Sequence, residues 1–226
     1  MKTLVIIPAF NEQDSIVDTV NSLKRTVPDI DYVVINDGSS DKTKELCEKN
    51  DFDTISLPIN IGLAGGFQAG MRYALRDGYD AALQFDADGQ HRSDYIQSLI
   101  DTMIEMKADI VIGSRFIHKK RHFSARTIGS SLISGLIKLT TGKKIQDPTS
   151  GMRLYNRHMI ELFVTKHDMA PEPDTLAYCL RKGAKIVEAP VEMEERLTGE
   201  SYLSLSKSVS YMLRTCISIL LLQWFR

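Results

Sequence analysis

Short apolar runs alternate with helically spaced apolar positions along most of the chain. The apolar runs cover residues 4–7, 32–35, 54–57, 81–85, 110–112, 152–155 and 185–189. Apolar residues at helical spacing cover residues 16–27, 67–75, 96–104, 128–137 and 176–180. Strands that alternate with amphipathic helices are typical of βαβ units around a parallel sheet. The pattern therefore predicts an α/β fold with a mostly parallel sheet flanked by helices.

The carboxyl-terminal segment, residues 201–226, carries a further amphipathic pattern from about residue 205 onward. Its continuous apolar part is well short of the ~20 residues that span a bilayer. The pattern predicts a helix that packs on the core, contacts another copy of the chain or lies on a membrane surface. Periodicity does not separate these three alternatives.

Composition and charge exclude some classes of function. The 226 residues carry a formal net charge of −1, so bulk charge does not indicate nucleic acid as a partner. Three widely spaced cysteines, Cys47, Cys179 and Cys216, predict free thiols in a reducing compartment. Residues 1–8 are too short an apolar run for a signal peptide, which makes the cytoplasm the expected location. Basic residues recur over 115–126, either as a solvated loop or as a phosphate-binding patch.

Polar clusters follow four of the predicted strands. They are Pro-Ala-Phe-Asn-Glu at 8–12, Asn-Asp-Gly-Ser-Ser-Asp at 36–41, Asp-Ala-Asp-Gly-Gln-His at 86–91 and Gly-Ser-Arg at 113–115. Each cluster alone is also typical of a turn. Ligands of open α/β sheets bind beyond the carboxyl ends of the strands, so four such clusters together predict a binding site there.

Asp86 and Asp88 are the strongest candidates for chemistry. In extended geometry two carboxylates two residues apart point the same way, and they repel unless a cation lies between them. Hard oxygen ligands suit Mg²⁺ or Mn²⁺, and Gln90 adds a neutral oxygen. The alternative is a tight turn at Asp88-Gly89 with Asp86 as a helix cap.

Two further segments are candidates for binding a nucleotide. The Asp37 carboxylate, at the end of a strand, can accept hydrogen bonds from a base or a ribose; alternatively it caps a helix starting near Asp41. Residues 60–70, which include Gly66, are dense in glycine and open a helix, so the backbone can approach a ligand closely. This segment matches neither the Walker A motif nor the dinucleotide-binding fingerprint.

Taken together, these segments resemble family 2 glycosyltransferases with the GT-A fold. The closest resemblance is to the branch of dolichyl-phosphate mannose synthase and bacterial polyprenyl-phosphate glycosyltransferases. The resemblance rests on the four clusters above, on NIGLAGGFQAG at 60–70 and on DPTSGMRLYNR at 147–157, in the family's order. It covers roughly residues 1–160 and extends less specifically to residues 188–201.

The resemblance implies roles for individual residues. The implied donor contacts are Pro8, Phe10, Glu12, Asp37, Gly66, Asp86, Arg115 and Arg196, with the two arginines touching phosphate. The implied metal ligands are Asp86, Asp88 and Gln90, holding Mg or Mn. The implied catalytic residues are Asp88, Asp147 and Glu172, with Glu172 as a base. The implied acceptor side includes Ser150, Gly151 and Arg153.

The resemblance also implies a reaction and an arrangement of the chain. A sugar would pass from a nucleotide-diphosphate sugar, with inversion, to a polyprenyl phosphate or to a lipid-linked or cell-surface glycan. A GT-A domain at 1–200 would comprise a nucleotide-sugar half (1–115) and an acceptor half (116–200), followed by the tail at 201–226. The protein would lie at the cytoplasmic face of the membrane. A sugar nucleotidyltransferase and a catalytically silent glycosyltransferase-like subunit that binds a partner are the alternatives.

Overall fold

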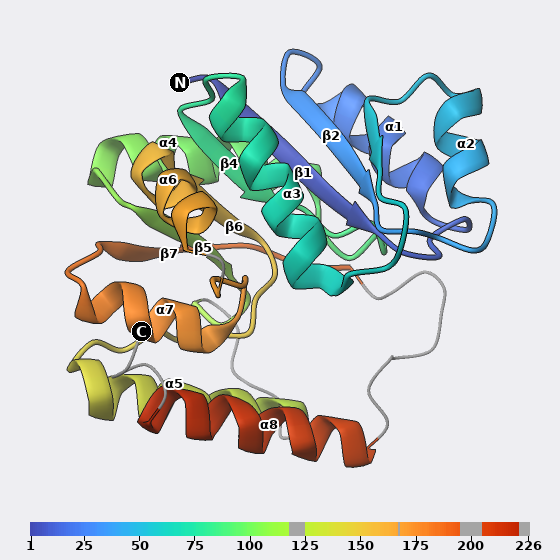
Figure 1. Ribbon diagram of the computed structural model, residues 1–226. Coiled ribbons are helices and arrows are strands. Elements are labelled where there is room, and N and C mark those ends of the chain that lie inside the picture. The colour runs from blue at the N-terminus through green and yellow to red at the C-terminus, as the bar shows by residue number, and fades with distance from the viewer. Residues whose placement is uncertain (118–124, 167, 195–204, 222–226) are drawn as a thin grey trace.

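The computed structural model describes residues 1–117, 125–166, 168–194 and 205–221 (Figure 1). Its strands are β1 (Thr3–Ala9), β2 (Asp31–Asn36), β3 (Thr54–Ser56), β4 (Ala81–Gln84), β5 (Ile110–Ser114), β6 (Arg153–Asn156) and β7 (Ile186–Pro190). Its helices are α1 (Ile16–Thr26), α2 (Thr43–Lys49), α3 (Gly62–Arg76), α4 (Ile96–Met106), α5 (Ala125–Thr141), α6 (Arg157–Thr165), α7 (Pro173–Arg181) and α8 (Leu205–Leu220), with a 3-10 turn at Ser93–Tyr95.

The strands form one sheet in the order β3-β2-β1-β4-β6-β5-β7. All neighbouring strands are parallel except β6, which runs antiparallel between β4 and β5. The chain moves outward from β1 through β2 to β3 and then returns to place β4 on the other side of β1. This reversal is a topological switch point, where open α/β sheets leave a crevice at the carboxyl ends of their strands. The prediction of a mostly parallel α/β sheet is confirmed.

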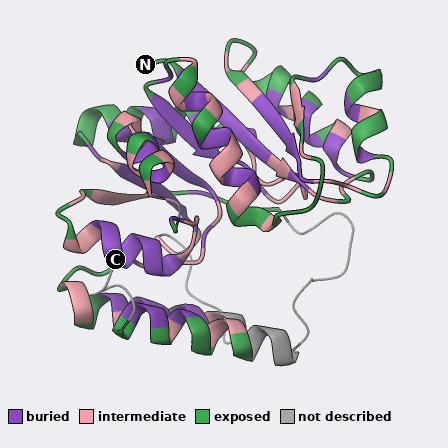
Figure 2. Ribbon diagram, viewed as in Figure 1, coloured by how far each residue is buried: buried purple, intermediate pink, exposed green. Residues whose placement is uncertain are grey.

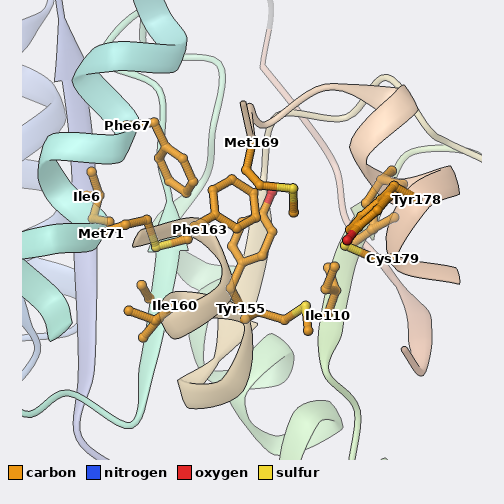
Figure 3. Packing of buried hydrophobic residues seen from close by; sticks show 14 of the residues in the cluster. Ile6, Phe67, Met71, Ile110, Tyr155, Ile160, Phe163, Met169, Tyr178 and Cys179 are labelled. Carbon is orange, nitrogen blue, oxygen red and sulfur yellow. The ribbon is translucent and has the colours of Figure 1, made fainter. Parts of the chain in front are cut away.

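Each face of the sheet buries its own hydrophobic core. Alternate residues of β1 point to opposite faces, as the two-residue period of a strand requires, so Ile6 lies in one core and Ile7 in the other. Helices α3, α5, α6, α7 and α8 contribute to the first core, and α1, α2 and α4 to the second. In the first core, Phe67, Tyr155 and Phe163 pack edge to face or tilted, with ring centroids 5.2–5.7 Å apart (Figure 3).

The structure departs from the sequence-based expectations at two elements. Helix α6 was not predicted, because it begins directly after β6 with no turn between them; Asn156 ends the strand and accepts a hydrogen bond from the Met159 amide as the helix cap. Strand β4 ends at Gln84 rather than at Phe85. The segment from Asp86 to Asp88 is therefore outside the strand, and the extended geometry expected for these two aspartates was wrong.

The predicted tail helix is α8, which packs against α5 and α7 (Figure 1). Ile219 is fully buried in the first core, whereas one face of α8 is exposed (Figure 2). No helix among the described residues is long and apolar enough to cross a membrane. The division into a domain at 1–200 and a tail stays a prediction. The three cysteines are free thiols, as expected.

Candidate active site

A pocket of about 450 Å³ opens at the carboxyl ends of β1, β2 and β4, beside the switch point. It is lined by Pro8, Ala9, Phe10, Glu12, Asp37, Asn60, Gly62, Leu63, Gly66, Asp86, Ala87 and Asp88. Three of the four predicted clusters and the glycine-dense segment thus meet at one place. Four of the lining side chains are carboxylic acids, and no Lys or Arg stands among the described residues that line the pocket.

Hydrogen bonds hold together the loops that follow β1 and β2. Asn11, whose φ of 56° is left-handed, donates its amide to Ser39 Oγ at 3.1 Å and accepts the Ser40 amide at 2.9 Å. The amide of the next residue, Glu12, donates to Thr43 Oγ1 at 2.8 Å. These contacts give the polar residues of both loops a structural role and hold Pro8, Phe10 and Glu12 at one side of the pocket.

Asp37 faces the pocket while its side chain is almost fully buried. Its Oδ1 accepts a hydrogen bond from the Ile61 amide at 2.9 Å, which ties the end of β2 to the start of α3. The residue at the N-cap of helix α2 is Lys42, and the Thr43 amide at the start of the helix donates to Asp41 Oδ1 at 2.9 Å. The alternative in which Asp37 serves as the cap is therefore wrong.

Asp86 and Asp88 line the pocket from a turn rather than from an extended strand. Asp88 Oδ1 accepts the Gln90 amide at 3.1 Å, and Gly89 has a φ of 77°, so the tight turn expected as the alternative is present. Asp86 is not a helix cap: Gln84 Nε2 donates to its Oδ1 at 3.1 Å, and its amide donates to His91 Nδ1 at 2.8 Å. Asp86 and Asp88 therefore line the pocket even though Asp88 and Gly89 form a tight turn.

The chemistry of this pair fits Mg²⁺ or Mn²⁺. Two carboxylates face a pocket in which the described residues place no cationic side chain. Among the described residues, no three His, Cys, Asp or Glu side chains come together as a complete metal site. A hard cation that keeps waters and takes phosphate oxygens needs only one or two protein carboxylates. Asp86 and Asp88 would hold such an ion; Gln90 lies on the same turn.

Arg115 and Asp147 form a buried ion pair next to this edge of the sheet. Arg115 Nε donates to Asp147 Oδ2 and Nη2 donates to Oδ1, both at 2.7 Å. The Asp147 carboxylate is fully buried, while a quarter of the Arg115 side chain stays exposed (26%). The Asp147 amide in turn donates to Glu188 Oε1 at 2.7 Å. In this geometry Asp147 positions the Arg115 side chain. A catalytic role for Asp147 stays a prediction.

The three predicted acceptor-side residues hold the loop that leads into β6. Ser150 Oγ donates to the Gly113 carbonyl at 2.6 Å, and Arg153 donates from Nε to the Ser150 carbonyl and from Nη2 to the Pro148 carbonyl, both at 2.7 Å. Both side chains are buried. Gly151 touches Asp86: a Cβ at Gly151 would lie 2.6 Å from Asp86 Oδ2. Contact with an acceptor stays a prediction for all three.

Glu172 lies outside the lining of the pocket, at the residue that precedes α7. It accepts a hydrogen bond from the Tyr211 hydroxyl of α8. Burial raises the pKa of the Glu172 carboxyl above its ordinary value, and Tyr211 and Arg153 oppose part of that rise. Burial and the neighbouring Glu172 likewise raise the pKa of Tyr211. A role for Glu172 as a base stays a prediction.

Residues 191–194 lie beside the turn that carries Asp86 and Asp88. The Glu194 amide donates to the Gln90 carbonyl at 3.0 Å, and His91 forms an isolated antiparallel bridge with Met193. Arg196, predicted to touch phosphate, lies outside the described residues and follows Glu194 by two positions.

Gln84 and His91 both contact Asp86, and the sequence predicted this role for neither residue. His91 stands inside the quoted Asp-Ala-Asp-Gly-Gln-His cluster, where its place in the motif was the only signal. Gln84 is the one polar residue within an otherwise apolar strand, β4. An uncharged polar side chain in a buried strand, two residues before a candidate ligand, is a signal that points to a supporting contact.

This fold and pocket define an α/β protein with an acidic pocket at the topological switch point of its sheet. The sequence model described as "Glycosyl transferase family 2" matches residues 4–163. The chain belongs to this glycosyltransferase family, as the resemblance implied.

Individual relatives agree with this assignment. The chain is 30% identical to an undecaprenyl-phosphate mannosyltransferase of Micrococcus luteus, over 90% of this chain and 88% of the relative. It is also 30% identical to a polyprenol monophosphomannose synthase of Mycolicibacterium smegmatis, over 90% and 81%.

Solved structures of glycosyltransferases share the GT-A fold of this chain. A glucosyl-3-phosphoglycerate synthase of Mycobacterium tuberculosis, solved with Mn²⁺, UDP and phosphoglyceric acid, gives a TM-score of 0.71 at 14% identity, covering 98% of this chain and 78% of that one. A mannosyltransferase of Pyrobaculum calidifontis, solved with GDP-mannose and Mn²⁺, gives 0.69 at 15% identity, covering 96% and 63%. At these identities the likeness shows the fold alone.

Proposed function

We propose that this protein is a metal-dependent, inverting glycosyltransferase that moves a sugar from a nucleotide-diphosphate sugar to a polyprenyl phosphate. A lipid-linked or cell-surface glycan is the alternative acceptor. The observation that carries the proposal is the pocket at the switch point, where four carboxylic acids meet without a Lys or Arg among the described lining residues. The names of the two relatives at 30% identity support the polyprenyl-phosphate acceptor.

The charge of the pocket supports the need for a metal. A nucleoside diphosphate is an anion, and an acidic pocket repels it unless a cation lies between them. Asp86 and Asp88, with Gln90 beside them, would hold Mg²⁺ or Mn²⁺, which when bound neutralises the diphosphate as it departs. Neighbours solved with Mn²⁺ agree with a divalent ion.

The remaining lining residues suit the nucleotide of the donor. Asp37 offers a carboxylate to the base or ribose, and Pro8, Phe10 and Glu12 line the same pocket. At Gly66 a Cβ would meet its nearest protein atom at 3.8 Å, which is ordinary contact. The protein alone therefore does not require glycine there, and close approach of the ligand to the backbone explains it.

The reaction needs a nucleophile behind the anomeric carbon. An oxygen of the acceptor forms the new bond there while the bond to the diphosphate oxygen breaks, and in-line attack inverts the configuration. A phosphate acceptor is already anionic and needs no base, so in this proposal Glu172 holds α8 rather than removing a proton. Product that retains the donor's configuration would contradict inversion.

Arg115 and Arg196 are proposed to compensate phosphate charge. Asp147 holds the Arg115 guanidinium through two hydrogen bonds, which leaves its partly exposed side chain fixed in place. The loop of Ser150, Gly151 and Arg153 would then shape the acceptor side, next to Asp86.

We further propose that the protein lies at the cytoplasmic surface of the membrane, where a polyprenyl phosphate resides. Helices α5 and α8 lie side by side (Figure 1). Each has exposed positions along its length (Figure 2), which include large apolar residues at helical spacing. These residues, the α5–α8 face, are Ile128, Leu132 and Leu139 of α5 and Leu213, Ile217, Leu220 and Leu221 of α8 and its end. Exposed apolar stripes on neighbouring helices are typical of a contact surface.

Charge favours a lipid surface over a second copy of the chain. Residues 125–144 and 205–221, which include α5 and α8, contain six Lys and Arg residues and no Asp or Glu. A two-fold dimer through the α5–α8 face would place these basic segments against each other, whereas an anionic membrane attracts them.

Thermal-shift binding tests the donor site. Ligand that binds only the folded protein raises the melting temperature by mass action. We expect one nucleoside diphosphate from a panel of UDP, GDP and dTDP to stabilise the wild type with Mn²⁺ present, and the Asp88→Ala variant to lose this effect. Stabilisation by none of them, with or without metal, would favour the catalytically silent subunit.

A further inference from the structure

Asp86 is held from outside the pocket by two buried side chains. Gln84 Nε2 donates to Asp86 Oδ1 at 3.1 Å, and His91 Nδ1 accepts the Asp86 amide hydrogen at 2.8 Å. Gln84 is 1% exposed and His91 is 7% exposed. Neither belongs to the lining of the pocket, so their contact with the site runs through Asp86.

The hydrogen bond at Nδ1 determines which His91 nitrogen carries the proton. A ring nitrogen that accepts a hydrogen bond is unprotonated, so in the neutral ring the proton is on Nε2. His91 Nε2 lies 3.5 Å from Asp86 Oδ2, which is an electrostatic contact longer than the roughly 2.7–3.2 Å of an N–H···O hydrogen bond. Both oxygens of the carboxylate therefore face an N–H group: Oδ1 that of Gln84 and Oδ2 that of His91.

Ring packing holds His91 in place, and strand pairing holds the backbone of Gln84. The His91 ring packs edge-on against Phe85, with centroids 5.5 Å apart, and its backbone bridges to Met193. Gln84 ends β4 between β1 and β6, opposite Ile6 and Arg153. Asp88 Oδ1 accepts a hydrogen bond from the Gln90 amide within its own turn.

We propose that Gln84 and His91 are positioning residues, which fix the Asp86 carboxylate so that it is ready to bind the divalent cation of the donor site. The inference rests on the proposed function, because it assigns a use to the same metal site. Partners in this position hold a ligand in its binding orientation, and their removal typically weakens metal binding by roughly 10- to 100-fold.

Binding of Mn²⁺ to the full-length protein, measured by the electron paramagnetic resonance signal of free Mn²⁺, tests this directly. Titrations with UDP present and with GDP present compare the wild type with Gln84→Met and His91→Phe. Each variant keeps the size of the side chain and loses its polar contact. We expect the Mn²⁺ affinity of each variant to fall by about 10- to 100-fold.

Two further variants separate positioning from general damage. Gln97→Met is a matched control, because Gln97 Nε2 also donates to a carboxylate, Asp101 Oδ1 at 2.8 Å on α4, away from the pocket; its Mn²⁺ affinity should equal that of the wild type. His91→Asn supplies an acceptor near the place of Nδ1 and should recover part of the affinity. His91→Asn also provides a test of the role of His91 if His91→Phe does not fold.

Coupling to Asp86 decides the outcome. In an Asp86→Asn background, Gln84→Met and His91→Phe should cause no further loss of Mn²⁺ affinity, because the carboxylate that they position is gone. Wild-type affinity in the single variants would overturn the inference, as would an undiminished loss in the Asp86→Asn background. A wild type that binds no Mn²⁺ with either nucleotide would instead overturn the proposed function and, with it, this inference.

Discussion

Gly151 lies against the carboxylate of Asp86 so closely that a Cβ there would be 2.6 Å from Oδ2. The two residues are 65 positions apart and belong to different motifs. The contact joins the loop that precedes β6 to the turn of the proposed metal site. It gives a physical reason for glycine at position 151, where space rather than backbone conformation is limiting.

Gly151→Ala should therefore move Asp86. Real Cβ atoms essentially never lie this close to another atom, so the loop or the carboxylate must shift. We expect a loss of about 1–3 kcal/mol in the free energy of unfolding, typical of overpacking. We also expect a fall of roughly tenfold or more in Mn²⁺-dependent nucleotide affinity, since the ligand is displaced. Denaturant unfolding and calorimetric titration measure the two effects.

Gly135→Ala is the matched control, because a Cβ at Gly135 in α5 would meet nothing within 4 Å. It should leave nucleotide affinity unchanged and add up to about 1 kcal/mol of stability through helix propensity. Equal nucleotide affinity in both glycine variants would show that the contact with Asp86 is without effect.

Asp147→Asn tests whether Asp147 positions Arg115 or acts as a catalytic residue. Breaking a buried ion pair by removing one partner costs about 3–5 kcal/mol. Because the Arg115 side chain is 26% exposed, we expect a loss near the lower end of that range, with activity falling alongside it. Denaturant unfolding measures the loss.

Glu161→Gln is the control for Asp147→Asn, because it breaks an exposed ion pair, that of Arg157 and Glu161. It should lower the free energy of unfolding by less than about 1 kcal/mol. Wild-type stability of Asp147→Asn combined with loss of turnover would instead favour a catalytic role for Asp147.

The elements with long, regular apolar patterns were predictable from the sequence. Strand β1 is buried on both faces and helix α4 is amphipathic, and both were found where expected. Helix α6 was missed because Arg157 follows β6 directly, so the change of period has no turn to mark it.

The candidate site was predictable as a set of clusters but not as a set of contacts. Asp37, Asp86 and Asp88 meet at the pocket because parallel strands bring their carboxyl ends to one edge. The contact of Gly151 with Asp86 depends on how the antiparallel strand β6 is inserted beside β4, which residue spacing does not reveal. The burial of Asp147 in an ion pair is likewise a property of the folded chain.

Glu172 should make stability depend on pH. Burial raises the pKa of its carboxyl in the folded protein, so the folded state keeps this proton to higher pH than the unfolded state does. The contribution of Glu172 to stability is therefore greatest below its unfolded pKa of about 4.3 and declines as pH rises toward the folded value. Asp174, Arg153, Arg214 and Tyr211 are the charged and titratable groups that face it.

Glu172→Gln removes this titration and keeps an acceptor for Tyr211. The stability of the variant relative to the wild type should rise between pH 4 and pH 7, as followed by denaturant unfolding at each pH. A difference that stays constant over this interval would show that Glu172 does not titrate there.

The α5–α8 face should bind anionic lipid. Leu132 and Ile217 are each about half exposed, at 53% and 50%, so replacing both with Gln removes apolar area without opening the core. We expect the double variant to pellet less with phosphatidylglycerol vesicles than the wild type, and added salt to weaken the wild type's binding.

The control for this face is Ile104→Gln, since Ile104 is 54% exposed on α4, which covers the other face of the sheet. Its vesicle binding should equal that of the wild type. If the Leu132 and Ile217 variant instead keeps its vesicle binding but changes from dimer to monomer in solution, the face is an oligomer contact.

Asp37 and Asp88 should affect nucleotide binding in different ways. Asp37 is proposed to contact the base or ribose, so Asp37→Asn should lower affinity equally with and without Mn²⁺. A charged hydrogen bond contributes about 1.5–3 kcal/mol, which corresponds to a loss of roughly 10- to 150-fold. Asparagine keeps an oxygen for the Ile61 amide, so the loop at the start of α3 stays in place.

Asp88→Ala should lower affinity only when Mn²⁺ is present. Calorimetric titration of each variant with the nucleoside and with its diphosphate separates the two roles, because the nucleoside has no phosphate through which a metal acts. A loss in Asp37→Asn that vanishes without Mn²⁺ would place Asp37 with the metal rather than with the nucleoside.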